Sequence, residues 1–128
     1  AETCHRLGVP FVKHTDGNME AVKGMFLAES GIDGYHAIEP RAGMDIGQLK
    51  REYGDKVCLL GNVDCAHTLV FGSVEDVVTE TKRCLQAASP GGGHVLSSSN
   101  SIHAGVRLCN FLAMIEAGKR YGSQPTGG

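Results

Sequence analysis

The feature that most limits the fold of this chain is a fourfold repeat of a short apolar run, a polar cluster and an amphipathic segment. The polar clusters lie at residues 14–18, 39–43, 61–65 and 97–103. Parallel strands need crossover helices, and right-handed crossovers bring every strand-to-helix loop to the same edge of the sheet. We therefore predict an α/β fold with a parallel four-stranded sheet whose polar residues meet at one edge, where such folds carry their sites.

The expected elements follow from the period of the apolar residues and from the residues that end each run. The clearest helix begins at Ser73, which forms a capping box with Asp76 in front of an apolar stripe. The expected strands are 10–14, 34–38, 56–60 and 94–97, and the expected helices are 19–30, 46–53, 74–88 and 108–121, after a helix end that closes at Gly8. We expect one domain over residues 1–122, followed by a glycine-rich flexible tail at 123–128.

Composition excludes several classes of partner. A net charge of −2 and a pI near 6.3 give no electrostatic attraction to nucleic acid or to a membrane surface. The 5 cysteines contain no CxxC pair, which indicates small packed side chains in a reducing, cytoplasmic setting. No apolar run approaches the roughly 18 residues that a membrane span needs. Periodicity alone does not decide between an open sheet with helices on both faces and half of an eight-stranded barrel.

At the polar clusters the sequence resembles the C-terminal half of the uroporphyrinogen decarboxylase-like family, a superfamily shared with the cobamide-dependent methyltransferases. The resemblance covers about residues 1–122 and lies in His14-Thr15-Asp16-Gly17-Asn18, Gly31-Ile32-Asp33-Gly34, Gly61-Asn62-Val63-Asp64 and Ser98-Ser99-Asn100-Ser101-Ile102-His103. It implies a (βα)4 half of a TIM barrel, corresponding to the last four strands of the family barrel. The first four units are missing, and with them the family's principal catalytic aspartate and its carboxylate-binding arginines.

Three functions follow as expectations from this resemblance. The first is a decarboxylase-like protein that binds a tetrapyrrole or a similar polycarboxylate and needs no cofactor. The second is a corrinoid-linked methyltransferase relative, whose family zinc site is His-x-Cys with a distant Cys. His14 matches that histidine, whereas Asp16 and Asn100 stand where the cysteines would be. The third is a non-catalytic half-barrel that associates with itself.

The candidate site residues lie at the ends of the predicted strands. His14 and Asp16 are the candidate catalytic pair, because residues that alternate along a strand point to the same side of the sheet. The candidate substrate-binding residues are Asn18, Glu39, Arg41, Asn62, Asp64, Asn100 and His103. No metal ligand is assigned.

Structural roles remain open for the same residues. Asp16 could cap a helix and His14 could hydrogen-bond a loop carbonyl. Glu39 and Arg41 could form an ion pair with each other, and Asp64 could orient His67 or a neighbouring loop. His5, His36 and His94 show no partner in the sequence and are taken as structural.

Half a barrel would leave two unpaired strand edges and an apolar interior in contact with water. We therefore expect a homodimer, in which two copies related by a twofold axis close eight strands into a ring. A second arrangement would pair helices and leave the sheet partly open.

Overall fold

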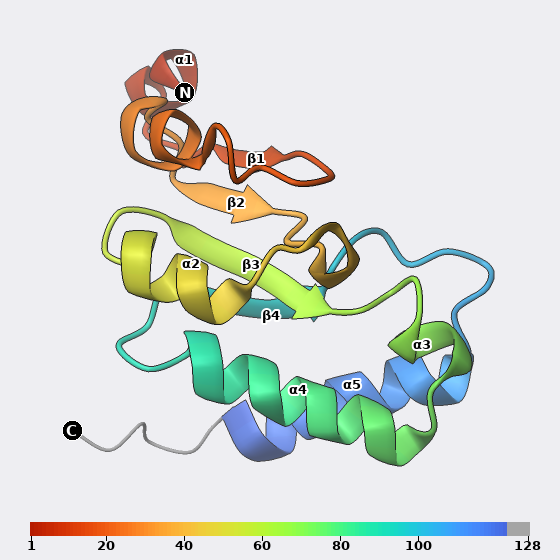
Figure 1. Ribbon diagram of the computed structural model, residues 1–128. Coiled ribbons are helices and arrows are strands. Elements are labelled where there is room, and N and C mark those ends of the chain that lie inside the picture. Colours follow the sequence, from red (N-terminus) through yellow and green to blue (C-terminus); the bar gives the residue numbers. More distant parts are fainter. Residues whose placement is uncertain (123–128) are drawn as a thin grey trace.

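The computed structural model describes residues 1–122, so the tail expected at 123–128 lies outside the described residues. Its centre is one sheet of four parallel strands in the order β1-β2-β3-β4 (Figure 1). The strands are β1 (Val12–His14), β2 (Gly34–His36), β3 (Cys58–Val63) and β4 (His94–Ser98). Each strand pairs with the next along the chain, as in a segment of a TIM barrel, whereas a doubly wound sheet reverses its strand order. The predicted α/β half-barrel with four parallel strands is therefore confirmed, and the sheet is open.

Helices cover one side of the sheet. They are α1 (Glu2–Arg6), α2 (Ile46–Tyr53), α3 (Thr68–Phe71), α4 (Val74–Ala88) and α5 (Leu108–Gly122), together with a π-helix η1 (Met25–Glu29) and a 3-10 helix η2 (Pro40–Ala42). Right-handed crossovers between successive neighbouring strands place the connecting helices on the same face. In Figure 1, α2 lies in front of β3, while α4 and α5 lie side by side at the far end of the sheet.

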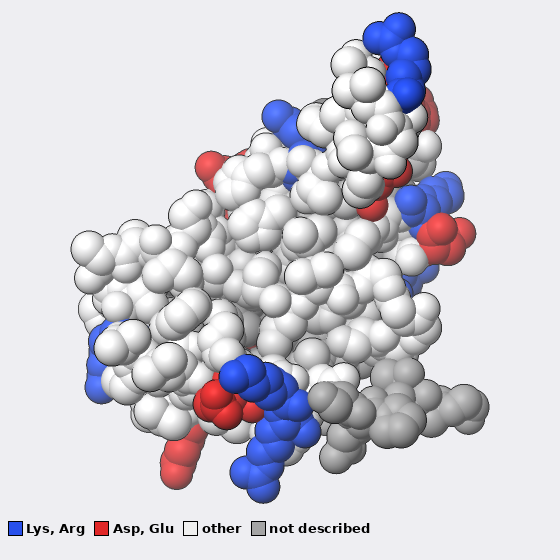
Figure 2. Space-filling view, turned by 180° about the vertical axis from the view of Figure 1, so that it is seen from behind, with Lys and Arg blue, Asp and Glu red and all other residues white. Residues whose placement is uncertain are grey.

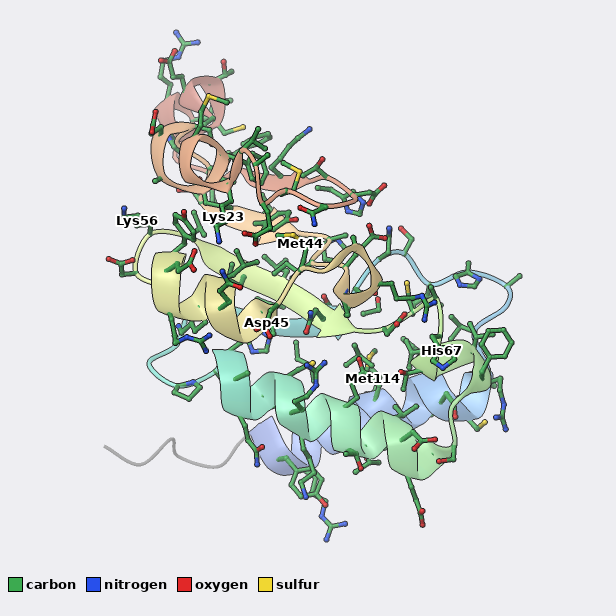
Figure 3. The ribbon with its side chains drawn as sticks, viewed as in Figure 1. Lys23, Met44, Asp45, Lys56, His67 and Met114 are labelled. Carbon is green, nitrogen blue, oxygen red and sulfur yellow. The ribbon has the colours of Figure 1, made fainter. Side chains whose placement is uncertain are left out.

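Two groups of buried side chains form the core between this sheet face and the helices. In the first, Tyr35 and Leu59 of the sheet meet Leu49 of α2. In the second, Val63 at the end of β3 packs with the helix residues Leu69, Val77, Cys84 and Met114. Figure 3 labels Met114 where α5 faces α4. Among residues 1–122, no helix is long and apolar enough to cross a bilayer.

The first crossover differs from the helix expected at 19–30. The structure has turns and the short η1 there, with only Leu27 buried. Val22 is 39% exposed and Met25 is 62% exposed, so the apolar stripe lacks a surface to pack against. Short helices gain most of their stability from such packing, which explains the irregular form. Lys23 instead holds this segment to α2 through Glu52, at 2.8 Å (Figure 3).

No helix of residues 1–122 covers the opposite side of the sheet. Val12 on β1 and Val95 on β4 are 46% and 49% exposed. Seen from behind, the molecule shows a broad area with few lysine, arginine, aspartate or glutamate side chains (Figure 2). Both outer strands, β1 and β4, also present a backbone edge that no other strand pairs with in the described structure.

Candidate functional site

Two histidines meet at the carboxyl ends of the first two strands. His14 is the last residue of β1 and His36 the last of β2, and the parallel register pairs them directly. Paired residues of neighbouring strands point to the same face, so the two rings lie side by side. Their Nδ1 atoms are 2.7 Å apart, and the ring centroids are 4.8 Å apart at a 54° tilt.

Hydrogen bonds extend this pair across the strand-end loops. His14 Nε2 lies 3.0 Å from Asp16 Oδ1, and Asn100 Nδ2 donates to the same oxygen at 2.9 Å. Asn100 Nδ2 also donates to Glu39 Oε1 at 3.1 Å. We call His14, Asp16, His36, Glu39 and Asn100 the strand-end network; it joins the loops that follow β1, β2 and β4.

The loop after β1 is shaped to take part in this network. Gly17 has a φ of +82°, a left-handed conformation that favours glycine. Its N–H donates to Glu39 Oε2 at 2.7 Å, so the turn closes on the loop that follows β2. The His14 and Asp16 side chains remain 46% and 62% exposed, which leaves them accessible to a ligand.

Asn18 and Arg41 lie at the border of the network. Asn18 Nδ2 donates to the carbonyl of Ala42 at 2.9 Å, so it ties the first loop to η2. Arg41 is exposed on η2, and within residues 1–122 no ion pair joins it to Glu39. Its guanidinium group is therefore open to an anionic group at this rim.

The other three candidate residues make separate contacts. Buried Asn62 accepts a hydrogen bond from Cys84 Sγ of α4 at 3.3 Å. Asp64 accepts from the backbone N–H groups of Ala66 and His67 at 2.8 and 2.9 Å, which supports the β3–α3 turn. His103 Nε2 lies 3.1 Å from the Cys65 carbonyl oxygen. The structure does not bring these three side chains into the strand-end network, and their part in binding stays a prediction.

His36 was missed as a site residue. Its Nε2 lies 3.2 Å from the carbonyl oxygen of Ser98 at the end of β4, which fixes the ring between β1 and β4. No sequence signal marks this pair, because the expected strand 34–38 continues beyond His36 to Ile38. Aligning the ends of the expected strands 10–14 and 34–38 would pair His14 with Ile38, whereas the observed register pairs His14 with His36.

Tyr35 lies next to His36 but points to the helix side of the sheet, where it is fully buried. Its hydroxyl has no hydrogen-bond partner in the described part of the chain. Burial, with smaller effects from the charges of Glu39 and Asp16, raises the pKa of this phenol to about 12. The hydroxyl is therefore neutral at ordinary pH, and it is not part of the exposed network.

The network does not fit the zinc site that the methyltransferase resemblance implies. Thiol-activating zinc sites are rich in thiolate ligands, whereas Asp16 and Asn100 offer a carboxylate and an amide. Both ring nitrogens of His14 are engaged, one by His36 and one by Asp16. Among the described residues, no group of three His, Cys, Asp or Glu side chains is placed to hold a metal ion.

Comparisons with known proteins agree with the half-barrel fold. The family model described as Uroporphyrinogen decarboxylase (URO-D) matches residues 1–121. A uroporphyrinogen decarboxylase from Alkalilimnicola ehrlichii is 33% identical over 113 residues, covering 85% of this chain and 28% of the relative. One from Nitrosomonas europaea is 33% identical over 109 residues, covering 85% of this chain and 29% of the relative.

Among solved structures, a methyltransferase from Methanosarcina mazei superposes with a TM-score of 0.78 at 24% identity. The superposition covers 95% of this chain and 34% of that one. This likeness shows the fold. The chain thus spans 28%, 29% and 34% of the length of these three proteins.

Proposed function

Because the chain belongs to the uroporphyrinogen decarboxylase (URO-D) family, we propose that its strand-end rim binds a tetrapyrrole or a similar polycarboxylate. The observation that carries this proposal is the strand-end network, which gathers His14, Asp16, Glu39 and Asn100 from three separate loops. Side chains gathered at the carboxyl ends of parallel strands are the usual basis of binding sites in barrel folds.

The strand-end network and the neighbouring Arg41 offer groups that complement both the pyrrole N–H groups and the carboxylates of such a ligand. The carboxylates of Asp16 and Glu39 accept hydrogen bonds, so they suit the N–H groups of pyrrole rings. The exposed guanidinium of Arg41 suits a carboxylate, which it can bind through two parallel hydrogen bonds. His14 supplies an imidazole that can donate or accept a proton near neutral pH.

A decarboxylation at this rim would use His14 as the proton donor. The bond between the ligand's side-chain carbon and its carboxylate breaks, and carbon dioxide leaves without the electron pair. The electrons remain on the carbon, which takes the proton from His14 Nε2 to complete a C–H bond. General acids placed in this way contribute about 10²- to 10⁴-fold in rate.

We also propose that a second copy of the chain completes the barrel, in the cytoplasm. The two unpaired strand edges and the exposed valines beside them support the dimer. The 5 unbridged cysteines suit a reducing compartment. A closed ring would place two strand-end networks around one central opening.

The test is titration of the folded protein with uroporphyrinogen, followed by analysis of the product carboxyl groups. We expect binding, and a loss of affinity of about tenfold in Asp16→Asn, equal to about 1.4 kcal/mol. Asp55→Asn, at an exposed aspartate beyond α2, is the matched control and should bind as the wild type does.

Absence of binding by the intact, folded protein would overturn the proposal. Binding without release of carboxyl groups would support the non-catalytic half-barrel over the decarboxylase. Equal affinity of Asp16→Asn and Asp55→Asn would show that the ligand binds away from the strand-end network.

A further inference from the structure

The hydrogen bonds around His14 and His36 fix how many protons the two rings carry. The Ser98 carbonyl oxygen has no proton to give, so His36 Nε2 must be the donor in their 3.2 Å contact. At the other end, His14 Nε2 faces the Asp16 carboxylate, which also only accepts when ionised. Both outer ring nitrogens therefore carry a proton.

One more proton lies between the rings. The two Nδ1 atoms are 2.7 Å apart, a distance at which one nitrogen donates and the other accepts. Two bare nitrogens would repel through their lone pairs, and two protonated nitrogens would clash. The four ring nitrogens thus share three protons, one more than two neutral imidazoles hold, and the pair has a single positive charge.

Placing the extra proton on Asp16 instead is unfavourable. A carboxyl group ordinarily loses its proton near pH 4, whereas imidazolium does so near about 6.5. Asp16 Oδ1 also accepts a hydrogen bond from Asn100 Nδ2, so this oxygen faces two donors. The charges facing the pair are Asp16 on the β1 loop and, through Asn100, Glu39 on the β2 loop, and both are acidic. No lysine or arginine among residues 1–122 is hydrogen-bonded to the network.

We propose that His14 and His36 form a proton-sharing imidazole pair. In this pair His36 is a positioning residue that keeps His14 protonated, so that His14 can act as the proton donor of the rim. His36 does not face the ligand directly. Its Nδ1 shares a proton with His14 Nδ1, which fixes that side of the His14 ring. Its Nε2 contacts the Ser98 carbonyl oxygen, which anchors the pair to β4. The donor role rests on the proposed function, whereas the proton count does not.

The three ring protons of the pair account for the transfer of one proton to the ligand. An incoming ligand displaces the exposed Asp16 carboxylate from His14 Nε2. The Nε2–H bond then breaks with its electron pair left on nitrogen, and the proton forms a C–H bond on the ligand carbon. The shared proton settles on His14 Nδ1, which still donates to His36 Nδ1. Both rings end neutral, with the hydrogen bonds to each other and to Ser98 kept, and solvent restores the lost proton.

The test is a pH titration of the ligand-free protein by ¹⁵N NMR of the histidine side chains. We expect the pair to hold three ring protons at about pH 6 and to take up a fourth only at a much lower pH, because two cations in contact repel. A ¹⁵N–¹⁵N coupling through the shared hydrogen bond should connect the rings of His14 and His36. His5, which lies 2.7 Å from Asp33 Oδ2 and has no imidazole partner, is the internal control and should show no such coupling.

His36→Phe removes the second ring while keeping an aromatic side chain. In this variant we expect His14 to titrate as one independent group, with the coupling gone and the His5 signal unchanged. If the variant does not fold, the wild-type titration alone decides the question. Independent titration of His14 and His36 in the wild type, or four ring protons at about pH 6, would overturn the proposal.

A functional measurement separates this proposal from the proposed function. If uroporphyrinogen is turned over, His36→Phe should lower kcat at least about tenfold and change its pH profile, while KM stays near the wild-type value. Turnover with an unchanged pH profile in His36→Phe would reject the positioning role and leave the decarboxylase intact. A protein that shows the proton-sharing pair but binds no uroporphyrinogen would reject the proposed function and leave the proton count intact.

Discussion

Tyr35 is the residue at which burial and hydrogen bonding conflict. Its ring packs edge-on against Phe26, with centroids 5.2 Å apart, while its hydroxyl is buried without a partner. An unsatisfied buried polar group costs about 1–3 kcal/mol. We therefore predict that Tyr35→Phe increases the free energy of unfolding by about 1 kcal/mol, as measured by urea denaturation. Tyr53→Phe is the control, since Tyr53 is only partly buried and its hydroxyl is not among the buried atoms that lack a partner, and it should change little. A loss of stability in Tyr35→Phe would mean that the hydroxyl has a partner in solution.

Asp33 links α1, β1 and β2 through one carboxylate. Oδ2 accepts from the backbone N–H of Phe11 at 2.6 Å and contacts His5 at 2.7 Å. These two interactions, the Phe11 hydrogen bond first, lower the pKa of the carboxyl group. A lowered pKa in the folded state contributes stability above the unfolded-state pKa, and this contribution is lost as pH falls through the folded-state value.

We predict that Asp33→Asn lowers stability at pH 7 and flattens the fall in stability on acidification below about pH 4. Thermal unfolding at a series of pH values measures both effects. Asp55→Asn is the control, because Asp55 is exposed and takes no part in the contacts with Phe11 and His5. If the acid unfolding of Asp33→Asn paralleled that of the wild type, the lowered pKa of Asp33 would be contradicted.

At the residue scale, the strand pattern predicts which polar residues lie close together better than it predicts their contacts. His14, Asp16, Glu39 and Asn100 are predicted as site residues because each lies at the end of an apolar strand or within three residues after it, and parallel topology gathers such positions. His36 was missed because its role depends on register, which a single strand does not reveal. The contact of Asn62 with Cys84 was also beyond prediction, since it needs the position of α4 over β3.

At the scale of elements, local signals predicted α4 and failed for the first crossover. The expected bounds of 74–88 agree with Val74–Ala88, because the Ser73–Asp76 capping box begins the helix and an apolar stripe packs it. The segment 19–30 has helical spacing, but only part of its apolar stripe packs on the core, and Val22 and Met25 stay exposed. A periodic pattern becomes a helix only when tertiary contacts support it.

The capping box gives a prediction for α4. Ser73 Oγ accepts from the Asp76 N–H at 3.1 Å, and Asp76 Oδ2 accepts from the Ser73 N–H at 2.8 Å. Ser73→Ala removes the first of these bonds and should lower the free energy of unfolding by about 1 kcal/mol in urea denaturation. Ser101→Ala replaces an exposed serine outside any helix and should have little effect. Equal stability of the two variants would show that the α4 cap contributes nothing measurable.

At the scale of the whole molecule, the open sheet determines which surfaces a partner would have to cover: one sheet face and the edges of β1 and β4. The register places Val12, Gly34 and Cys58 on one face, and it places Leu60 with Val95 on that same face. Strand order and this uncovered face follow from the repeat of strands and helices in the sequence. How the edges are covered does not, because it depends on the fit of two surfaces rather than on any local pattern.

A twofold dimer would cover both edges at once. Rotation about the barrel axis brings β4 of one copy beside β1 of the other in parallel, so unpaired N–H and C=O groups gain partners at two equivalent seams. Val12 and Val95, which are 46% and 49% exposed, would meet across each seam. We predict a mass of twice 13.5 kDa by size-exclusion chromatography with light scattering at micromolar concentration.

Val95→Lys places a charge in the proposed seam, where burial without a partner is costly. The variant should weaken association at least about tenfold, or about 1.4 kcal/mol, and shift the eluted protein toward the monomer. Val74→Lys is the matched control, because Val74 is 47% exposed at the start of α4 and lies away from both strand edges. A compact wild-type monomer at micromolar concentration would contradict the dimer, and equal dissociation of the two lysine variants would place the interface away from β4.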